Sequence, residues 1–333
     1  MKIITLEEHF EIAEIKKAVA RFLPASREQF YQPPTRQLED LGGHRLAEMD
    51  AMGIDVQVLS HTSAGLSLIP AAEAIALARA INDQLAETVQ NHPDRFVGFA
   101  TLPTSDPEAA AHELERSVTV LGFKGAMIHG QTNNRFLDDP SFRPILETAA
   151  ALDVPLYLHP APPSHVIQDA YYAGFDPAVS ASFATFGWGW HLDTGIHALR
   201  MILGGVFDRY PNLQVLLGHW GEMIPFYLAR FAEALTPAAS QLQRPVADYF
   251  VQQMYITPSG MFTLPSFLLA MQVVGAERIL YSVDYPFHFQ EGGQARAFLE
   301  NAPISPADKE KIAHSNAERL LKLSSLYHSD VKK

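Results

Sequence analysis

The stretch that decides the fold is KIITLEEHF, residues 2–10, in which an apolar run ends in a Glu-x-His pair. Lys2–Leu6 has the composition of a short buried strand, and Glu7 and His9 follow it directly. Because residues two apart on a strand point to the same side, both side chains are expected to project together from the strand end. The pair would place a carboxylate and an imidazole side by side, where both could contact the same bound group.

Seven further apolar runs follow, and longer helical patterns lie between most of them. The expected strands are Ile54–Ser60, Phe96–Leu102, Phe123–His129, Pro155–His159, Leu213–His219, Met254–Thr257 and Arg278–Asp284. The expected helices are Ala72–Asn91, Pro107–Val120 with Asp106 as its cap, Pro140–Leu152, Thr194–Tyr210, Pro225–Leu235 and Leu264–Val274. Most strands are continuous β-rich runs, as in parallel sheets buried on both faces. Eight alternations predict an α/β protein, a (β/α)8 TIM barrel formed by residues 1–333 as one domain.

Two segments interrupt this rhythm. Phe22–Gly43 is polar and contains two adjacent prolines, and Pro160–His191 is rich in proline, glycine and aromatic residues. They are expected to be long loops after strands one and five. Both would lie at the C-terminal face of the barrel, where active sites of this fold sit.

Composition limits the function classes. The formal net charge of −12 argues against non-specific binding to nucleic acid or to an anionic membrane surface. The chain has no cysteine, which excludes disulfides, thiolate metal sites and a cysteine nucleophile. No apolar run is long enough to span a membrane, and the first residues lack the features of a signal peptide. A cytoplasmic protein is therefore expected.

Ionisable side chains stand at the ends of the expected strands, which a barrel brings to one rim. They are Glu7, His9, His61, His129, His159, His219 and Asp284. Imidazole and carboxylate together suit a divalent transition ion such as Zn²⁺ or Mn²⁺. A lone histidine is more often a core or surface residue than a ligand. So many on one face favour a metal site.

Two carboxylates near these strand ends have a chemical and a structural interpretation. Glu222 follows His219 by three residues and is expected to fix the tautomer of that imidazole, although it would also favour a helix N-terminus. Asp284 would serve as a metal ligand or as a proton donor and acceptor, but it would also suit the turn before Pro286.

Candidates for substrate contacts are less specific. Arg230 lies in an apolar helical stretch and would hold a carboxylate or phenolate, or else be a helix-surface or interface residue. Aromatic side chains of the second long segment would line a pocket or pack the loop, and the sequence leaves both open. They are Phe183, Phe186, Trp188 and Trp190.

The motifs together resemble the metal-dependent decarboxylase branch of the amidohydrolase superfamily, and within it the γ-resorcylate decarboxylases. The matching stretches are LEEHF, MDAMGIDVQVLS, HPDRFVGFATLP, YLHP, HALRMILGGVFDRYPNLQVLLGH, GHWGE, YITPSG and ILYSVDYPF. They run along nearly the whole chain. Each is short, and the specificity lies in their order and spacing.

The resemblance implies a set of roles. The implied ligands of a single Zn²⁺ or Mn²⁺ are Glu7, His9, His159 and Asp284. His219, with Glu222 beside it, would be the active-site histidine, and Arg230 would contact the substrate. The implied reaction is the reversible, non-oxidative decarboxylation of a small ortho-hydroxy aromatic acid of the dihydroxybenzoate type. It needs no organic cofactor, and the implied assembly is a homodimer or homotetramer.

Some features separate decarboxylases from hydrolases, and others depart from the pattern. Glu7 stands where hydrolases usually have histidine, and Lys124 lies near the start of its strand, which disfavours a binuclear hydrolase. His61 and His129 stand where Asn-like residues are expected, and both should face the substrate, as should Phe186 and Trp188. A mononuclear hydrolase of a lactone or ester, with Asp284 as general base, remains the alternative. A binding barrel with a vestigial site would require the rim residues to be incidental.

Overall fold

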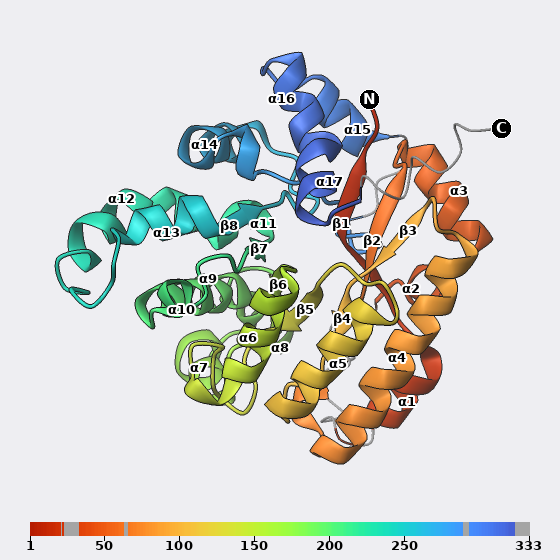
Figure 1. The fold of residues 1–333 in the computed structure, drawn as a ribbon, viewed down its shortest axis with the longest axis horizontal. Coiled ribbons are helices and arrows are strands. Elements are labelled where there is room, and N and C mark those ends of the chain that lie inside the picture. Colours follow the sequence, from red (N-terminus) through yellow and green to blue (C-terminus); the bar gives the residue numbers. More distant parts are fainter. Residues whose placement is uncertain (21, 23–32, 63–65, 289–292, 324–333) are drawn as a thin grey trace.

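The computed structural model describes residues 1–20, 22, 33–62, 66–288 and 293–323. Its strands are β1 (Ile4–Phe10), β2 (Val56–His61), β3 (Phe96–Gly98), β4 (Ala100–Thr101), β5 (Ala126–His129), β6 (Leu156–His159), β7 (Val215–Leu217) and β8 (Met254–Ile256). All ladders are parallel, in the orders β1-β2-β3 and β4-β5-β6-β7-β8. The bridges Ile256↔Ile279 and Thr5↔Tyr281 join β8 to β1. The strands thus close into the predicted (β/α)8 barrel, with helices around it (Figure 1).

Two of the predicted strands are formed differently. The run Phe96–Leu102 divides at Phe99, because the Phe99 amide donates to Leu59 in β2 whereas the next amide, that of Ala100, donates to Gly125 before β5. The run Arg278–Asp284 makes only the two bridges named above, so it closes the barrel without forming a regular ladder. The remaining strands are shorter than predicted at one or both ends, except that β1 and β2, which begin two residues later than predicted, also end later, at Phe10 and His61.

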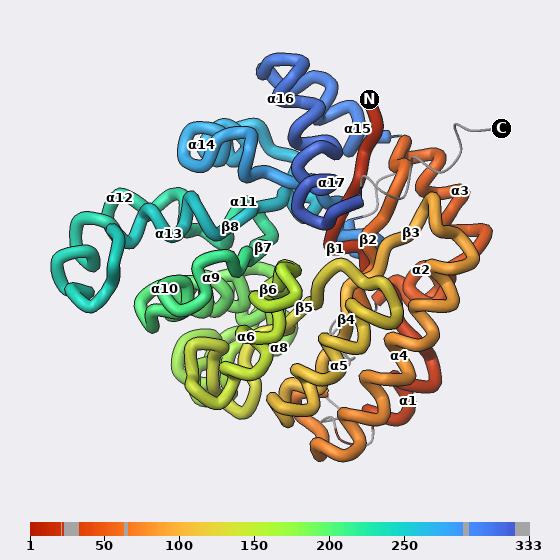
Figure 2. Tube along the Cα trace, in the orientation of Figure 1, coloured from red at the N-terminus to blue at the C-terminus, as the bar shows by residue number. Residues whose placement is uncertain are grey.

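The outer layer consists of helices that alternate with the strands (Figures 1 and 2). Its main members are α4 (Ala71–Asn91), α5 (Pro107–Thr119), α6 (Arg143–Leu152), α9 (Gly189–Leu203), α12 (Ile224–Leu235) and α14 (Leu264–Val274). Asp106 caps α5 as predicted, accepting from the Ala109 amide at 3.1 Å. The predicted helix Thr194–Tyr210 was wrong at its start and in its continuity. α9 begins at Gly189, and left-handed Gly205 (φ 70°) separates it from α10 (Val206–Arg209).

The barrel interior is filled by one apolar cluster from the strands. Helix α17 (Asn316–Leu320) covers the end of the barrel at which the strands begin. The cluster comprises Ile4, Leu6, Val56, Val58, Val97, Phe99, Met127, Tyr157, Leu216, Tyr255 and Leu280, joined by Ala317, Leu321 and Leu323. Lys2, which precedes β1, pairs with Glu318 of α17 at 2.9 Å. The end where the strands begin is therefore closed by α17, and the polar residues lie at the opposite ends of the strands.

The two predicted long loops have different outcomes. Residues 23–32 of the segment Phe22–Gly43 lie outside the described residues, and its described part contains α2 (Thr35–Glu39). Pro160–His191 was wrongly predicted to be a loop. It contains α7 (His165–Ile167), a π-helical turn (Gln168–Tyr172), α8 (Pro177–Ala184) and the start of α9. Asp176, before Pro177, caps α8 by accepting from the Ala178 amide at 3.0 Å, a helix-start pattern that the aromatic composition obscured. Among the described helices, none is long and apolar enough to cross a membrane.

Candidate metal centre

Glu7 reaches the barrel mouth from a bulge in β1. Thr5 pairs with Gln57 and Glu8 with Leu59, so that Leu6 and Glu7 together oppose a single residue of β2. Glu7 has a left-handed φ of 64°, a conformation that costs a non-glycine residue on the order of 1–3 kcal/mol. The simple two-residue alternation predicted for Glu7 and His9 is therefore interrupted, and both residues lie within β1 rather than after it.

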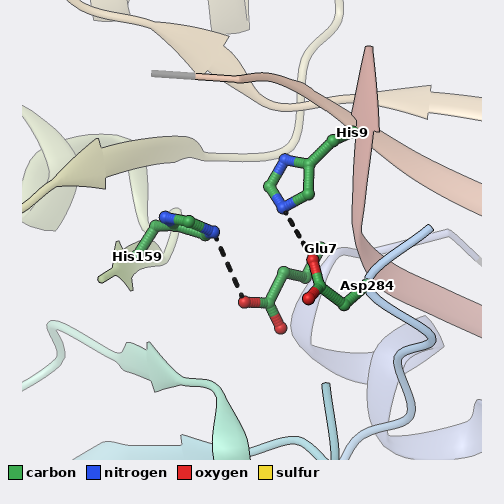
Figure 3. Close-up of side chains that lie close together, drawn as sticks. All are labelled: Glu7, His9, His159 and Asp284. Carbon is green, nitrogen blue, oxygen red and sulfur yellow. Dashed lines mark ion pairs between the residues drawn. The ribbon is translucent and has the colours of Figure 1, made fainter. Parts of the chain in front are cut away.

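Four side chains converge at this point, and they are the four predicted ligands. Glu7 and His9 come from β1, His159 ends β6, and Asp284 follows the segment that closes the barrel. Their ligand atoms all lie within 4.8 Å of one another. His9 Nε2 is 3.2 Å from Asp284 Oδ1, and His159 Nε2 is 3.7 Å from Glu7 Oε1 (Figure 3). We call these four residues the metal cluster.

The electrostatics of the metal cluster fit a bound divalent cation. Glu7 Oε1, His9 Nε2 and Asp284 Oδ1 are buried without any hydrogen-bond partner. Burial raises the pKa of Glu7 and that of Asp284 to about 7, and it lowers the pKa of His9 to about 4. His159 Nδ1 donates to the Pro160 carbonyl at 2.8 Å, which leaves the lone pair of Nε2 facing the cluster. Two neutral imidazoles and two carboxylates in need of positive charge suit Zn²⁺ or Mn²⁺.

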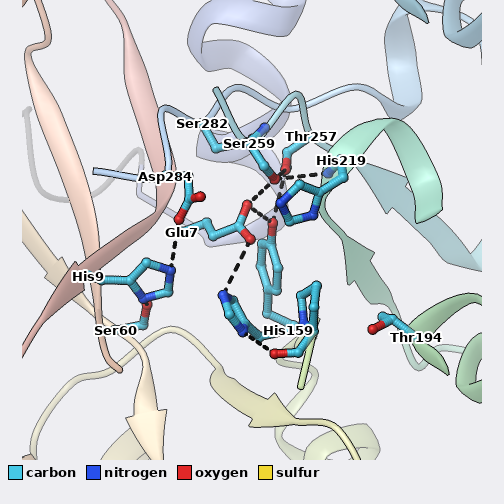
Figure 4. A network of polar contacts seen from close by, with 12 residues as sticks. Glu7, His9, Ser60, His159, Thr194, His219, Thr257, Ser259, Ser282 and Asp284 are labelled. Carbon is cyan, nitrogen blue, oxygen red and sulfur yellow. Dashed lines mark hydrogen bonds and ion pairs between the residues drawn. The ribbon is translucent and has the colours of Figure 1, made fainter. Parts of the chain in front are cut away.

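A set of hydroxyl groups orients Glu7. Its Oε2 accepts from the phenol of Tyr157 at 2.5 Å and from the hydroxyl of Ser259, while Oε1 is left for the cluster (Figure 4). The Tyr157 hydroxyl also contacts Thr257 Oγ1 at 2.9 Å. Sequence reasoning missed these partners, although Tyr157 lies in YLHP and the other two lie in YITPSG.

Two further buried side chains, Glu8 and Arg45, brace the other ligands from behind. The Glu8 carboxylate accepts from the amides of Val283 (2.8 Å) and Tyr285 (3.3 Å), the two residues that flank Asp284. Arg45, on α3 (Gly43–Met52), donates to the backbone carbonyl of His9. Glu8 and Arg45 are fully buried. Neither was predicted to belong to the site.

A second polar cluster adjoins the first. β7 ends at Leu217, so His219 lies in the short α11 (His219–Glu222) rather than at the end of the predicted strand. His219 and Glu222 both have left-handed φ values, 48° and 51°. His219 Nδ1 is 2.7 Å from Glu222 Oε1, the contact expected from their spacing, and His191 Nδ1 is 2.8 Å from Glu222 Oε2. We call His191, His219 and Glu222 the relay cluster.

The contacts within the relay cluster favour the protonated form of His219 and the ionised form of Glu222. Burial alone would lower the pKa of His219, but the charge of Glu222 and its hydrogen bond, together with other carboxylates, raise that pKa to about 9. Burial would raise the pKa of Glu222, but His219 and His191 hold it below its ordinary value. The His219 amide donates to Ser259 Oγ at 2.9 Å, so the serine that contacts Glu7 also contacts the relay cluster (Figure 4).

His61 and His129 lie beside the metal cluster. The His129 ring is 4.7 Å from that of His159, and His61 Nδ1 donates to the Thr62 carbonyl at 2.6 Å. Burial lowers the pKa of His61 to about 4 and that of His129 to about 3, and Nε2 of each is buried without a partner. They are neutral imidazoles with free capacity for a hydrogen bond, and their contact with substrate stays a prediction.

Three other predicted contacts lie at the surface of the chain. The Arg230 side chain is 72% exposed on α12 and pairs with Glu233 at 3.2 Å. Phe186 and Trp188 are exposed by 49% and 41%. The structure does not bring Arg230 into either cluster, and all three roles in substrate binding stay predictions.

The sequence matches a known protein family and is similar to named enzymes over nearly its whole length. A family model described as amidohydrolase matches residues 20–323. A gamma-resorcylate decarboxylase of Rhodococcus jostii is 38% identical, covering 96% of this chain and 98% of that protein.

Solved structures agree with this. A dihydroxybenzoic acid decarboxylase from a Polaromonas species, with bound manganese and the inhibitor 2-nitroresorcinol, has a TM-score of 0.84 at 36% identity, covering 98% and 99% of the two chains. A 5-carboxyvanillate decarboxylase from Novosphingobium aromaticivorans, with manganese and a nitrobenzoic acid, has a TM-score of 0.88 at 34% identity, covering 97% and 96%.

Proposed function

The chain belongs to the amidohydrolase family, and on this premise we propose that it is a metal-dependent, non-oxidative decarboxylase of an ortho-hydroxy aromatic acid related to dihydroxybenzoate. The observation that carries the proposal is the juxtaposition of the metal cluster with the hydrogen-bonded His219–Glu222 pair, which Ser259 links to Glu7. The relatives named for such reactions support it, and two of them hold manganese.

The metal cluster would hold one Mn²⁺ or Zn²⁺ through Glu7, His9, His159 and Asp284. When bound, the ion supplies positive charge that binds a substrate carboxylate and the adjacent phenolate oxygen. The Glu8 carboxylate holds the backbone on both sides of Asp284, and Tyr157 orients Glu7. These contacts hold the metal-ligand side chains in place before substrate enters, which keeps the reacting groups aligned.

Asp284 would donate a proton from its carboxyl group to the ring carbon that carries the carboxylate. The bond from that carbon to the carboxylate then breaks, its electron pair returns to the ring, and CO2 leaves. In the metal-free fold burial raises the pKa of Asp284 to about 7, so this carboxyl group can both take up and release a proton near neutral pH. Asp284 is left as a carboxylate that must be reprotonated.

His219 would hold a proton towards the phenolate of the substrate. Its pKa of about 9 keeps the imidazole cationic at neutral pH, and Glu222 fixes Nδ1 as a donor, so Nε2 also carries a proton. Substrate contacts by Arg230, Phe186, Trp188, His61 and His129 are further parts of the proposal, as is a cytoplasmic homodimer or homotetramer. For Arg230 the test is an Arg230→Ala variant, in which a raised KM at unchanged thermal stability would support the contact.

The proposal is tested by incubating the purified protein with Mn²⁺ or Zn²⁺ and a panel of ortho-hydroxybenzoates, measuring CO2 and phenol. The matched control is the meta-hydroxy isomer of each substrate, which cannot chelate through adjacent oxygens and should not react. The reverse reaction is expected at high bicarbonate. A lactone and ester panel is assayed in parallel. Hydrolysis of those compounds without any release of CO2 from the benzoates would refute the proposal.

A further inference from the structure

Glu222 is shared by two histidines, only one of which the sequence pointed to. His219 comes from the turn after β7, and His191 comes from the first turn of α9, in the aromatic segment that follows β6. Their Nδ1 atoms lie 2.7 and 2.8 Å from different oxygens of the same carboxylate, and their ring centroids are 4.4 Å apart. His191 is therefore built into the relay cluster as closely as His219.

The contact with Trp190 determines the protonation of His191. The indole Nε1–H is only a donor, and it lies 3.0 Å from His191 Nε2, which must accept with its lone pair. The proton of a neutral His191 is then on Nδ1, where it is donated to Glu222 Oε2. The Phe186 carbonyl, 3.1 Å from the same Nε2, accepts nothing from His191 in this tautomer.

A directional chain of hydrogen bonds results. It runs from the Trp190 indole to His191, and each imidazole then donates one N–H to the Glu222 carboxylate. Glu222 is only 2% exposed, so an oxygen without a donor would be costly, on the order of 1–3 kcal/mol. With both oxygens engaged, the carboxylate cannot rotate away from His219.

We propose that His191 is a positioning residue for His219, acting through Glu222, and that Trp190 selects the tautomer of His191 that this requires. His191 contributes the second anchor of the carboxylate and does not touch the metal cluster. The inference deepens the proposed function and rests on it for the kinetic measurement only.

The inferred role links the aromatic segment to the active-site histidine. Trp190 is held at the start of α9, where its carbonyl accepts from Thr194 Oγ1 at 2.7 Å and its ring faces that of Phe186 at 6.1 Å. A displacement of this segment would remove the donor from Glu222 Oε2. The orientation of His219 thus depends on the placement of a segment that lies far from it in the chain.

The kinetic test compares His191→Leu, which removes the donor, with His191→Gln, whose amide can still donate to Glu222. We expect His191→Leu to lower kcat about 10- to 100-fold, with KM changed less than about threefold and bound metal unchanged. His191→Gln should recover most of kcat. Wild-type kcat in the folded leucine variant, or an equal loss in the glutamine variant, would overturn the inference.

A second measurement does not depend on activity. Nitrogen-15 NMR of the histidine-labelled, zinc-loaded wild-type protein should show His191 with Nδ1 protonated and Nε2 bare, and the Trp190→Phe variant should lose this preference. A wild-type His191 protonated at Nε2 would overturn the inference whether or not the variants fold. If the wild type shows the expected tautomer but releases no CO2 from any benzoate, the proposed function fails and the positioning role stands.

Discussion

The metal cluster and the relay cluster meet at the same barrel mouth but are built in opposite ways. In the metal cluster, Glu7 Oε1, His9 Nε2 and Asp284 Oδ1 are buried without a hydrogen-bond partner and face only one another and His159. In the relay cluster, both oxygens of Glu222 accept a hydrogen bond from a histidine. Burial raises the pKa of Glu7 and Asp284, whereas two imidazole partners hold that of Glu222 below its ordinary value.

This difference shows which cluster is complete without a ligand. A buried polar atom without a partner costs on the order of 1–3 kcal/mol, and more if it is charged, so the unpaired atoms mark where compensation must come from outside the chain. The paired carboxylate of the relay cluster needs no such compensation. The first arrangement is suited to a cation and the second to holding a proton in a fixed direction.

The largest expected effect comes from removing a ligand of the metal cluster. Glu7→Ala should abolish metal binding and lower activity about 10³-fold or more, because several kcal/mol of stabilisation by the ion are lost. The barrel should stay folded, since the apolar cluster of the interior is untouched and the Tyr157 and Ser259 hydroxyls that lose Glu7 keep contacts with Thr257 and the His219 amide. Elemental analysis, CO2 release and circular dichroism measure the three quantities.

Glu87→Ala, at an exposed position on α4, is the matched control for that variant and should change none of them. Retention of metal by Glu7→Ala would mean that the buried atoms without hydrogen-bond partners in the metal cluster are not where the ion binds.

Changing the relay cluster should separate activity from metal content. In Glu222→Gln the side-chain amide presents N–H to one of the two imidazole N–H groups, so one histidine must change tautomer. We expect a loss in kcat of about 100-fold with full metal occupancy. Kinetics at saturating substrate and elemental analysis test this. Loss of metal together with kcat would show that the two clusters are one unit.

The positions of these residues show what the sequence could predict. Glu7, His9, His159 and Asp284 are far apart in the chain, but the barrel topology brings strand ends to one rim, and strand-end positions can be recognised from apolar runs. Glu222 could be paired with His219 because they are three residues apart. Predictions of this kind depend only on topology and local spacing.

The parts that were missed depend on tertiary contacts. The bulge at Glu7 follows from the register between β1 and β2, which no periodicity records. His191 lies in a segment predicted to be a loop, and its partner Glu222 is on another element. Tyr157 and Ser259 look like ordinary strand and turn residues until their hydroxyl groups are seen at Glu7.

The next expected effect is a pH dependence of metal affinity. Burial raises the pKa of Glu7 and Asp284 to about 7 in the metal-free fold, so folding favours their protonated forms. The free energy of unfolding of the metal-free protein should therefore fall as pH rises from about 4 through 7. Metal binding requires the ionised forms, so affinity should weaken about fivefold for each carboxyl group, about 30-fold for the two together, as pH falls from 7 to 6.

Calorimetric titration with Zn²⁺ at several pH values, in buffers of different ionisation enthalpy, measures both the affinity and the protons released. A metal affinity that does not change between pH 6 and 7 would contradict the raised carboxyl pKa values. Glu87→Ala serves as the control, since an exposed residue on α4 should leave this pH dependence unchanged.

The smallest expected effect concerns the Ser259 hydroxyl, which contacts both clusters. Ser259 donates to Glu7 Oε2 and accepts from the His219 amide at 2.9 Å. Ser259→Ala removes about 1 kcal/mol of hydrogen bonding on each side, which corresponds to about a fivefold loss. We expect a loss of this size in both metal affinity and kcat at saturating metal. If only metal affinity falls, Ser259 belongs to the metal cluster alone, and the relay cluster is held by Glu222 and His191 without it.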